Sequence, residues 1–342
     1  MPLLLSALLA VSSYAAAAPA RGPYIVDASS TAAKVCWRDA AGRDACSAYD
    51  GLEPGAGFNY TIPAREGSWS ARTLPPVGKP LRFAVFGDSG RGGKKQRQVA
   101  KAVERWAPDL VLLAGDIVYP AGADADYDGG FFSPYARLLP KLPFFPAPGN
   151  HDYGNSREAS AGRKRWSEGY ARVFRRWPYY SFDAGNAHVA VVDSNREGFG
   201  ILAAPSLADG STQRDWLERD LKASKARWKF VILHVPPYSS GEHGSSVALQ
   251  RLLGPVFERH KVDVVFAGHD HHYERTHPVA GTVYFVVGTG GASLYTVDPR
   301  EPWSAKTVVD HGFLGVTLDG GSAQFEFYDA AGILRDSARL QK

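Results

Sequence analysis

The sequence has 342 residues, of which 44% are hydrophobic and 22% are charged, a composition typical of a folded globular protein. Its 39 Lys and Arg residues against 35 Asp and Glu residues give a net charge of +4, which is too small to indicate a polyanionic partner. The sequence has no basic run interleaved with aromatic residues, so nothing in it supports nucleic-acid binding. The length suffices for one large α/β domain with a small companion domain.

The first residues have the composition of an export signal. Residues 3–11 are apolar and residues 15–20 are rich in small side chains, so we expect a signal peptide over residues 1–20 with cleavage near Ala18 or Ala20. The alternative is an apolar N-terminus without this role. No other stretch is apolar over enough residues to cross a bilayer. The sequence therefore predicts a secreted or periplasmic protein with no membrane partner.

Residues 21–75 have the pattern of a small β-domain. Short strands separated by turns are expected at residues 24–26, 34–37, 58–62 and 69–73. This number of residues is small for a complete β-sandwich. We therefore expect this domain to pack against the neighbouring domain. The Pro- and Gly-rich residues 74–80 predict a stiff linker.

The chain has two cysteines, Cys36 and Cys46, on either side of a predicted hairpin. A three-residue loop that ends at Gly42 would form a bulged turn, because glycine tolerates positive φ. That register places Asp39 opposite Arg43 and, further along the strands, Cys36 opposite Cys46. We expect a cross-strand disulfide, which requires an oxidising compartment. The alternative is a pair of buried free thiols.

From residue 81 onwards, apolar strands alternate with helices. Strands are expected at residues 82–86, 109–114, 143–147, 179–182, 188–192, 228–233, 262–267 and 283–287, with two more near the C-terminus. Helices are expected at residues 94–106, 163–176, 212–222 and 247–260. This alternation predicts one α/β domain over residues 81–342 with buried, largely parallel sheets.

Five of the buried strands end in polar residues. These residues are Asp88, Asp116, Asn150 with His151, His234, and His269 with His271. Ligands bind beyond the carboxyl ends of strands in open α/β sheets, so we expect these side chains to meet in one crevice. Oxygen and imidazole groups without a cysteine predict a shared metal site and exclude a structural cysteine–zinc site.

Two other groups near these motifs have simpler interpretations. His272 and His277 follow the last pair of candidate ligands, and we expect them at the rim of the crevice or on the surface. Asp124, Asp126 and Asp128 have the spacing of a calcium-binding loop but lack its glycine and terminal glutamate, so we expect no calcium site there.

The strand-end residues resemble, in order, the five motif blocks of the metallophosphoesterases. The resemblance spans residues 82–276. In the first block the usual Asp-x-His is absent, because Ser89 and Gly90 follow Asp88, and Tyr119 supplies a tyrosine in the second block instead. This exchange resembles the purple acid phosphatases, as does Tyr-Glu-Arg at residues 273–275. The resemblance implies an α/β sandwich with two mixed sheets flanked by helices, preceded by a small fibronectin-like β-domain.

The same resemblance implies two metal ions. Fe(III) would be held by Asp88, Tyr119 and His271, a divalent Fe, Zn or Mn ion by Asn150, His234 and His269, and Asp116 would bridge the two ions. A phenol, whose pKa is near 10, becomes a ligand at acid pH only if a strongly polarising cation such as Fe(III) removes its proton. Imidazole and oxygen ligands together suit each of the three divalent ions.

The implied reaction is hydrolysis of small phosphate monoesters by direct attack of metal-bound hydroxide. We expect His151, next to a ligand, to donate a hydrogen bond to the phosphate. By resemblance, His243 in the loop after His234 would bind the phosphate or protonate the leaving oxygen; the alternative is a solvent-exposed loop residue. A phosphodiesterase on the same metals is an alternative function. A surface binding protein with an inert metal site is a third hypothesis, which the intact ligand set disfavours.

Overall fold

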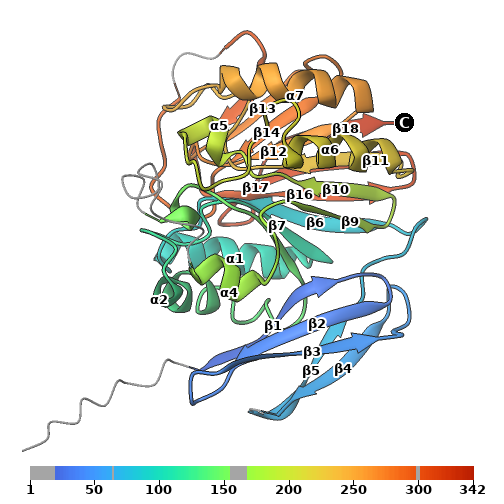
Figure 1. Ribbon diagram of the computed structural model, residues 1–342, viewed down its shortest axis with the longest axis vertical. Helices are drawn as coiled ribbons and strands as arrows, with labels where there is room; N and C mark the ends of the chain where they lie inside the picture. The colour runs from blue at the N-terminus through green and yellow to red at the C-terminus, as the bar shows by residue number, and fades with distance from the viewer. Residues whose placement is uncertain (1–19, 64, 155–167, 298–300) are drawn as a thin grey trace, which may run out of the picture.

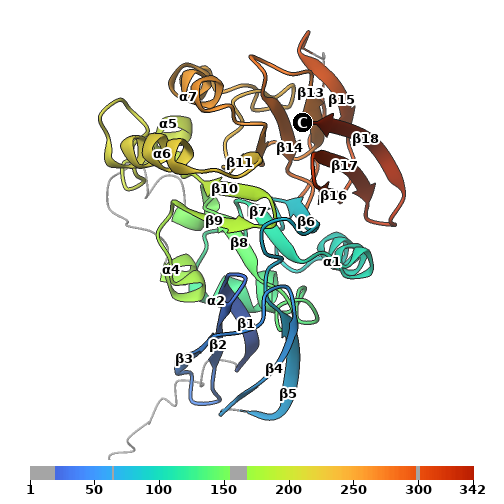
Figure 2. The ribbon, with the colours of Figure 1, turned by 90° about the vertical axis from the view of Figure 1, so that its right-hand side faces the viewer.

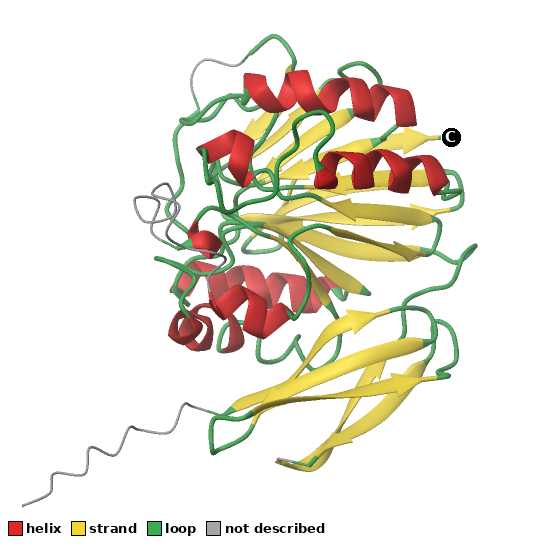
Figure 3. Ribbon diagram, viewed as in Figure 1, coloured by secondary structure: helices red, strands yellow, loops and turns green. Residues whose placement is uncertain are grey.

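The computed structural model describes residues 20–63, 65–154, 168–297 and 301–342. Two large β-sheets lie face to face at the centre of the molecule, with helices on their outer sides, and a group of small strands lies at the N-terminal end (Figure 1). Colouring by secondary structure shows helices above and below the strands of the two large sheets (Figure 3). This architecture confirms the predicted α/β sandwich and its N-terminal β-unit.

The N-terminal β-unit consists of five strands in two small sheets. The three-stranded antiparallel sheet contains β1 (Arg21–Ala28), β2 (Ala32–Arg38) and β3 (Asp44–Asp50), and the two-stranded sheet contains β4 (Gly57–Ile62) and β5 (Arg65–Arg72). Strand β5 begins four residues before Trp69, where the sequence predicted its start. The prediction missed these first residues because they are exposed and lack an apolar pattern.

The hairpin between β2 and β3 has the predicted register. The amide of Asp39 donates to the carbonyl oxygen of Arg43, and Gly42 adopts a φ of 78°. Cys36 pairs with Cys46 across the ladder, and the two sulfurs form a disulfide. The alternative of two free thiols is therefore wrong.

Removing this disulfide should weaken the β-unit without disturbing the polar strand ends. The crosslink closes a short loop, with a sequence separation of 10 residues, so its loss should lower the free energy of unfolding by about 2–3 kcal/mol. Denaturant titration of the Cys36→Ala/Cys46→Ala double variant measures this loss, and its metal content should equal that of the wild type. Mass spectrometry of the unreduced protein that finds two free thiols would contradict the crosslink.

The β-unit is joined to the rest of the molecule through buried arginines. The Arg21 guanidinium lies 2.9 Å from Asp124 and 2.7 Å from Asp128, and Arg38 bridges Asp44 and Asp124, each at 2.8 Å. Both arginines are almost fully buried. The first and last members of the acidic triplet therefore serve as ion-pair partners for the β-unit, which leans on its neighbour as predicted.

The six-stranded sheet combines a parallel half with an antiparallel half. In spatial order its strands are β18 (Leu334–Gln341), β17 (Ser322–Asp329), β16 (Gly312–Asp319), β6 (Leu81–Phe86), β7 (Leu110–Ala114) and β8 (Phe144–Ala147). Strands β6, β7 and β8 run parallel, and β16 to β18 are antiparallel. The sequence predicted fewer C-terminal strands, because the edge strand β18 is mostly exposed and polar.

The seven-stranded sheet faces the first sheet across the main core. In spatial order its strands are β15 (Ser304–Val308), β13 (Tyr273–Thr276), β14 (Val283–Val287), β12 (Val264–Ala267), β11 (Trp228–Ile232), β10 (Ala187–Val191) and β9 (Tyr180–Ala184). Strands β10, β11, β12 and β14 are parallel and the outer pairs are antiparallel. Both sheets are therefore mixed, and their parallel strands are largely buried and apolar.

Helices cover the outer faces of both sheets, as the view turned by 90° also shows (Figure 2). The three longest are α1 (Lys94–Trp106), α6 (Thr212–Ala223) and α7 (Val247–His260), as predicted. Of the helix expected at 163–176, residues 163–167 lie outside the described residues, and α4 (Glu168–Phe174) is the described part. Shorter turns that the sequence did not predict are α2 (Asp124–Tyr127), η1 (Asp128–Phe132), η2 (His151–Tyr153) and α5 (Asn195–Phe199). Among the described residues, no helix combines the length and apolarity needed to cross a membrane.

A buried histidine links the edge of the seven-stranded sheet to α6. The ring of His188 lies 2.8 Å from carboxylate oxygens of both Asp183 and Asp220. Burial by itself lowers the pKa of His188, but the hydrogen bonds to Asp220 and Asp183 outweigh burial and raise the pKa. The folded protein therefore binds this proton more tightly than the unfolded chain does.

His188→Gln should destabilise the protein more at acid pH than at alkaline pH. The raised pKa means that the stabilisation is complete below about pH 6.5 and is lost as the pH rises through the folded-state pKa. We expect a loss of about 1.5–3 kcal/mol in the free energy of unfolding at pH 5, the range for hydrogen bonds to charged groups. Urea titrations at pH 5 and pH 9 measure the loss, with the exposed His277→Gln as control. An equal loss of stability at both pH values would contradict the expected role of the His188 proton.

Candidate metal centre

The polar strand ends of both sheets converge on one buried cluster. Asp88 follows β6 and Asp116 follows β7 in the six-stranded sheet, and His234 follows β11 in the seven-stranded sheet. Each of these three residues offers a ligand atom within 4.8 Å of the others, and all three are buried. The two sheets therefore bring together side chains that are far apart in the chain.

One half of the cluster is centred on the phenol of Tyr119. Its oxygen lies 3.2 Å from Oδ1 of Asp88, 3.1 Å from Oδ2 of Asp116 and 3.2 Å from Nε2 of His271. Nε2 of His271 is also 3.2 Å from Oδ1 of Asp88. These four side chains are the set that the resemblance assigns to Fe(III), with Asp116 as the bridge.

The other half of the cluster is centred on His234. Its Nε2 lies 3.0 Å from Oδ1 of Asn150 and 3.4 Å from Oδ1 of Asp116. The ring of His269 lies edge-on to this ring, with 5.3 Å between the centroids. The two carboxylate oxygens of Asp116 thus face different halves, which is the arrangement of a bridging ligand.

Two of the histidines are oriented by backbone carbonyl groups. Nδ1 of His234 lies 2.8 Å from the carbonyl oxygen of Ala114, and Nδ1 of His271 lies 2.6 Å from that of Ser293. A proton on Nδ1 satisfies each carbonyl and leaves the lone pair of Nε2 pointing into the cluster. Each backbone contact therefore orients its ring so that Nε2 faces the cluster, as a metal ligand requires.

The backbone at the cluster is strained. Asp88, Asp116 and His269 have φ values of 55°, 48° and 69°, a region that non-glycine residues rarely adopt. A Cβ on Gly149 would lie 2.2 Å from Oδ1 of Asp116, and one on Gly268 would lie 2.5 Å from Oδ2 of Asp88. These glycines allow the chain to pass directly against the ligand groups.

The electrostatics of the cluster fit the binding of cations. Burial, and then the charges of Asp116 and Asp88, raise the pKa of Tyr119 well above its ordinary value. Burial, and then the rings of His234 and His243, lower the pKa of His269 to about 2, so its imidazole is neutral. Burial lowers the pKa of His234, but Asp116 outweighs burial and raises the pKa to about 10, so a bound cation would displace a proton from this ring. Carboxylates, a phenol, an amide oxygen and imidazoles form a donor set suited to iron, zinc or manganese.

His151 lies at the open side of the cluster. Its backbone amide donates to Oδ1 of Asp116 at 2.8 Å, and its Nδ1 contacts the carbonyl oxygen of Pro120. Nε2 is 3.9 Å from Oδ2 of Asp116, and the side chain is 35% exposed. Solvent or a substrate can therefore reach part of this side chain.

His243 is exposed, yet its ring reaches the cluster. It stacks on His269 with 4.2 Å between the ring centroids and an interplanar angle of 20°. Exposure agrees with the alternative interpretation of a loop residue, but the stacking places the ring beside a candidate ligand. The structure thus brings all nine predicted site residues together.

Sequence reasoning assigned no site role to several residues around the cluster. Tyr295 stacks on His271, with 4.1 Å between the centroids, and contacts the edge of the His243 ring. Asp270 is fully buried, and its Oδ1 accepts a hydrogen bond from the amide of His243 at 2.9 Å. The expectation for His272 was wrong: it is fully buried and lies 3.2 Å from Glu274. His277 is exposed, as predicted.

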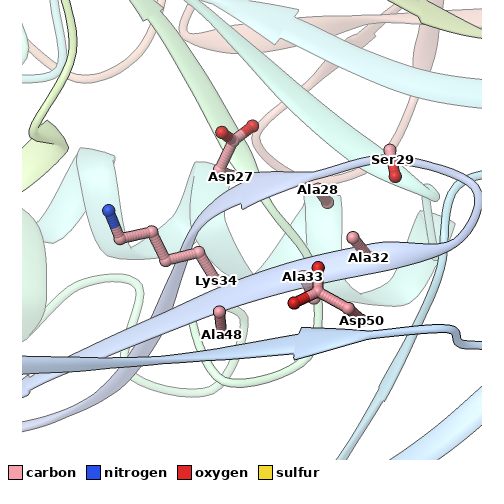
Figure 4. Close-up of a pocket in the computed structure, with 8 residues that line it drawn as sticks. All are labelled: Asp27, Ala28, Ser29, Ala32, Ala33, Lys34, Ala48 and Asp50. Atoms are coloured by element: carbon pink, nitrogen blue, oxygen red, sulfur yellow. The ribbon is translucent and has the colours of Figure 1, made fainter.

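A separate hollow of about 250 Å³ lies on the three-stranded sheet of the β-unit (Figure 4). It is lined by Asp27, Ala28, Ser29, Ala32, Ala33, Lys34, Ala48 and Asp50. None of these side chains belongs to the strand-end cluster, and half of them are alanines. The hollow therefore adds no candidate ligand to the cluster.

Comparisons with known proteins agree with this geometry. The profile of the calcineurin-like phosphoesterases matches residues 81–273, more than half of the chain, and that of the iron/zinc purple acid phosphatase-like protein C matches residues 281–337. The chain therefore belongs to the calcineurin-like phosphoesterase family. Within that family, its C-terminal match is that of the purple acid phosphatases, the group that the presence of Tyr119 predicted.

Named relatives support the same placement, and a solved structure shares the fold. Purple acid phosphatase 21 of Arabidopsis thaliana is 29% identical over 279 residues, which cover 74% of this chain and 60% of that protein. Purple acid phosphatase 7 of the same plant is 27% identical over 292 residues, which cover 77% and 86%. The purple acid phosphatase PPD1 from yellow lupin seeds shares the fold, with a TM-score of 0.77, 19% identity and coverage of 93% and 74%. The chain spans 52–60% of the length of the first curated relatives it matches.

Proposed function

We propose that the protein is a secreted or periplasmic acid phosphatase that hydrolyses small phosphate monoesters. The observation that carries this proposal is the placement of Asp116, whose two oxygens face two separate ligand sets. Such a carboxylate can hold two cations close together, as two-metal phosphoesterases require. The disulfide between Cys36 and Cys46 is consistent with an oxidising compartment. The predicted signal peptide over residues 1–20 falls almost entirely on residues outside those described.

The described residues fit one trivalent and one divalent ion. Asp88, Tyr119 and His271 with Asp116 would hold Fe(III), and Asn150, His234 and His269 with Asp116 would hold a divalent Fe, Zn or Mn ion. When bound, the ions supply Lewis acidity toward the phosphoryl oxygens and acidify a water molecule. The phenol of Tyr119 contributes the anionic ligand that favours the trivalent ion.

Two histidines act on the substrate directly. His151, held through Nδ1 by the carbonyl of Pro120, directs Nε2 toward the phosphate and stabilises the charge on its oxygens. His243, stacked on His269, lies where it can donate a proton to the leaving oxygen of the ester. No side chain is needed as a covalent carrier of the phosphoryl group.

Hydrolysis of p-nitrophenyl phosphate and of its bis ester tests the proposal. Purified protein should release p-nitrophenol from the monoester at acid pH with a much higher kcat/KM than from the bis ester. Faster turnover of the bis ester would instead identify a phosphodiesterase on the same site. If the metal-loaded protein cleaves neither ester, the proposed activity is wrong and a binding role becomes the better account.

A further inference from the structure

We propose that Glu274, together with Asp270, is a positioning residue that holds the loop of residues 235–246 so that His243 faces the cluster. The inference rests on the role proposed above for His243 and deepens it. The loop connects β11 to α7 and has no regular secondary structure. His243 lies near its exposed tip, so something other than a helix or strand must fix the ring.

Glu274 binds the loop through both of its carboxylate oxygens. Its Oε2 accepts the amide of Ser240 at 2.7 Å, and its Oε1 accepts the hydroxyl of Ser240 at 2.6 Å. The same carboxylate also contacts His272, whose Nε2 lies 3.2 Å from Oε2 of Glu274. Glu274 and His272 are both fully buried. A buried carboxylate is costly unless it is well bonded, and this one uses two of its bonds to hold one loop residue.

Asp270 binds the same loop on either side of Ser240. Its Oδ1 accepts the amide of His243 at 2.9 Å, and its Oδ2 accepts the hydroxyl of Ser239. Between these contacts the loop lies directly on Asp270 and His272. A Cβ on Gly241 would be 2.6 Å from both Cγ of Asp270 and Cε1 of His272.

The anchors explain why an exposed ring holds a defined position. The amide of His243 is tied to Asp270, so the ring starts from a fixed backbone and stacks on His269. Proton donation requires this placement, because a donor must stay within hydrogen-bond reach of the leaving oxygen. Weakening the anchors should therefore reduce proton donation while leaving the metal ligands in place.

Glu274→Gln is the sharpest test, because Asp270 lies between two ligands and Glu274 does not. The amide side chain keeps the shape but replaces one acceptor of the Ser240 bonds with a donor. We expect kcat for an alkyl phosphate such as ethyl phosphate to fall about 10–100-fold, the range for partners that orient a functional group. Hydrolysis of p-nitrophenyl phosphate should change little, because its leaving group departs without protonation. In a His243→Ala background, Glu274→Gln should add no further loss.

Hydrogen exchange of the loop provides a readout that is independent of catalysis. Glu274→Gln should speed amide exchange over residues 238–244. Asp336→Asn is the matched control, because Asp336 accepts bonds from Tyr273 and Arg275 of the same strand, β13, and does not contact the loop. This control should leave loop exchange and alkyl phosphate turnover unchanged.

Two results would overturn the inference: unchanged loop exchange in Glu274→Gln, or losses from Glu274→Gln and His243→Ala that multiply fully in the double variant. Failure of the proposed function is distinguishable from both. If His243→Ala leaves alkyl phosphate turnover intact, the chemistry proposed for His243 is wrong. The exchange measurement then decides by itself whether Glu274 holds the loop.

Discussion

Asp116→Asn should remove most of the activity and bound metal at once. The carboxylate reaches Tyr119 with Oδ2 and His234 with Oδ1, so it belongs to both halves of the cluster. An amide offers one neutral oxygen and a donor nitrogen, and it cannot bridge two cations. Replacing residues that only orient ligands costs 10–100-fold, so we expect the loss of a shared ligand to lower kcat/KM by more than about 100-fold.

The control for this variant lies at the other end of the same strand. Asp109 precedes β7, and its Oδ2 accepts the amide of Arg82 at 2.9 Å, whereas Asp116 follows β7. Asp109→Asn should therefore keep both metals and nearly full activity, whatever it costs in stability. Elemental analysis and hydrolysis assays of the two variants measure the contrast. An Asp116→Asn protein that retained two metal ions and wild-type turnover would disprove the bridging role.

His151→Ala should lower kcat by about 10²–10³ while metal content stays at the wild-type level. The ring is assigned to stabilising charge on the phosphate in the transition state, and removing one such donor typically has an effect of this size. The backbone amide of His151, which donates to Asp116, remains in the variant, so the ligand geometry is kept.

Steady-state kinetics and metal analysis of the same preparation separate the two possible roles of this ring. Loss of a metal together with activity would make His151 a ligand, since its Nε2 lies 3.9 Å from Asp116. Full activity would leave the ring without a role in the reaction. The exposed His277→Ala should match the wild type in both measurements.

The metal centre could be predicted from the sequence because each of its motifs directly follows an apolar strand in the chain. Buried parallel strands such as β6, β7 and β11 carry their functional residues directly after the last apolar position, so their ends identify the ligands. The hairpin of Cys36 and Cys46 was predictable for a similar reason. The position of Gly42 determines the turn, and the turn determines the register of both strands.

Features that depend on tertiary contacts could not be predicted in this way. Tyr295, in the segment after β14, stacks on His271 and donates its amide to the carbonyl oxygen of His271, and no periodicity of the sequence marks that contact. The burial of His272 follows from the loop of residues 235–246 packing over it. Strand β18 alternates exposed polar and partly buried residues and pairs at a sheet edge, so it lacks the apolar run that identifies a buried strand.

Tyr119 is proposed to bind a trivalent iron ion in a two-metal phosphatase. The most direct test is the visible absorption spectrum of the iron-containing protein and of Tyr119→Phe, with metal content measured on the same samples. A phenolate on Fe(III) produces a ligand-to-metal charge-transfer band, so the wild type should be coloured and contain about two metal ions, at least one of them iron. Phenylalanine offers no oxygen, so the variant should lose the band. A colourless iron-loaded wild type, or an unchanged band in the variant, would show that Tyr119 is not a ligand of Fe(III).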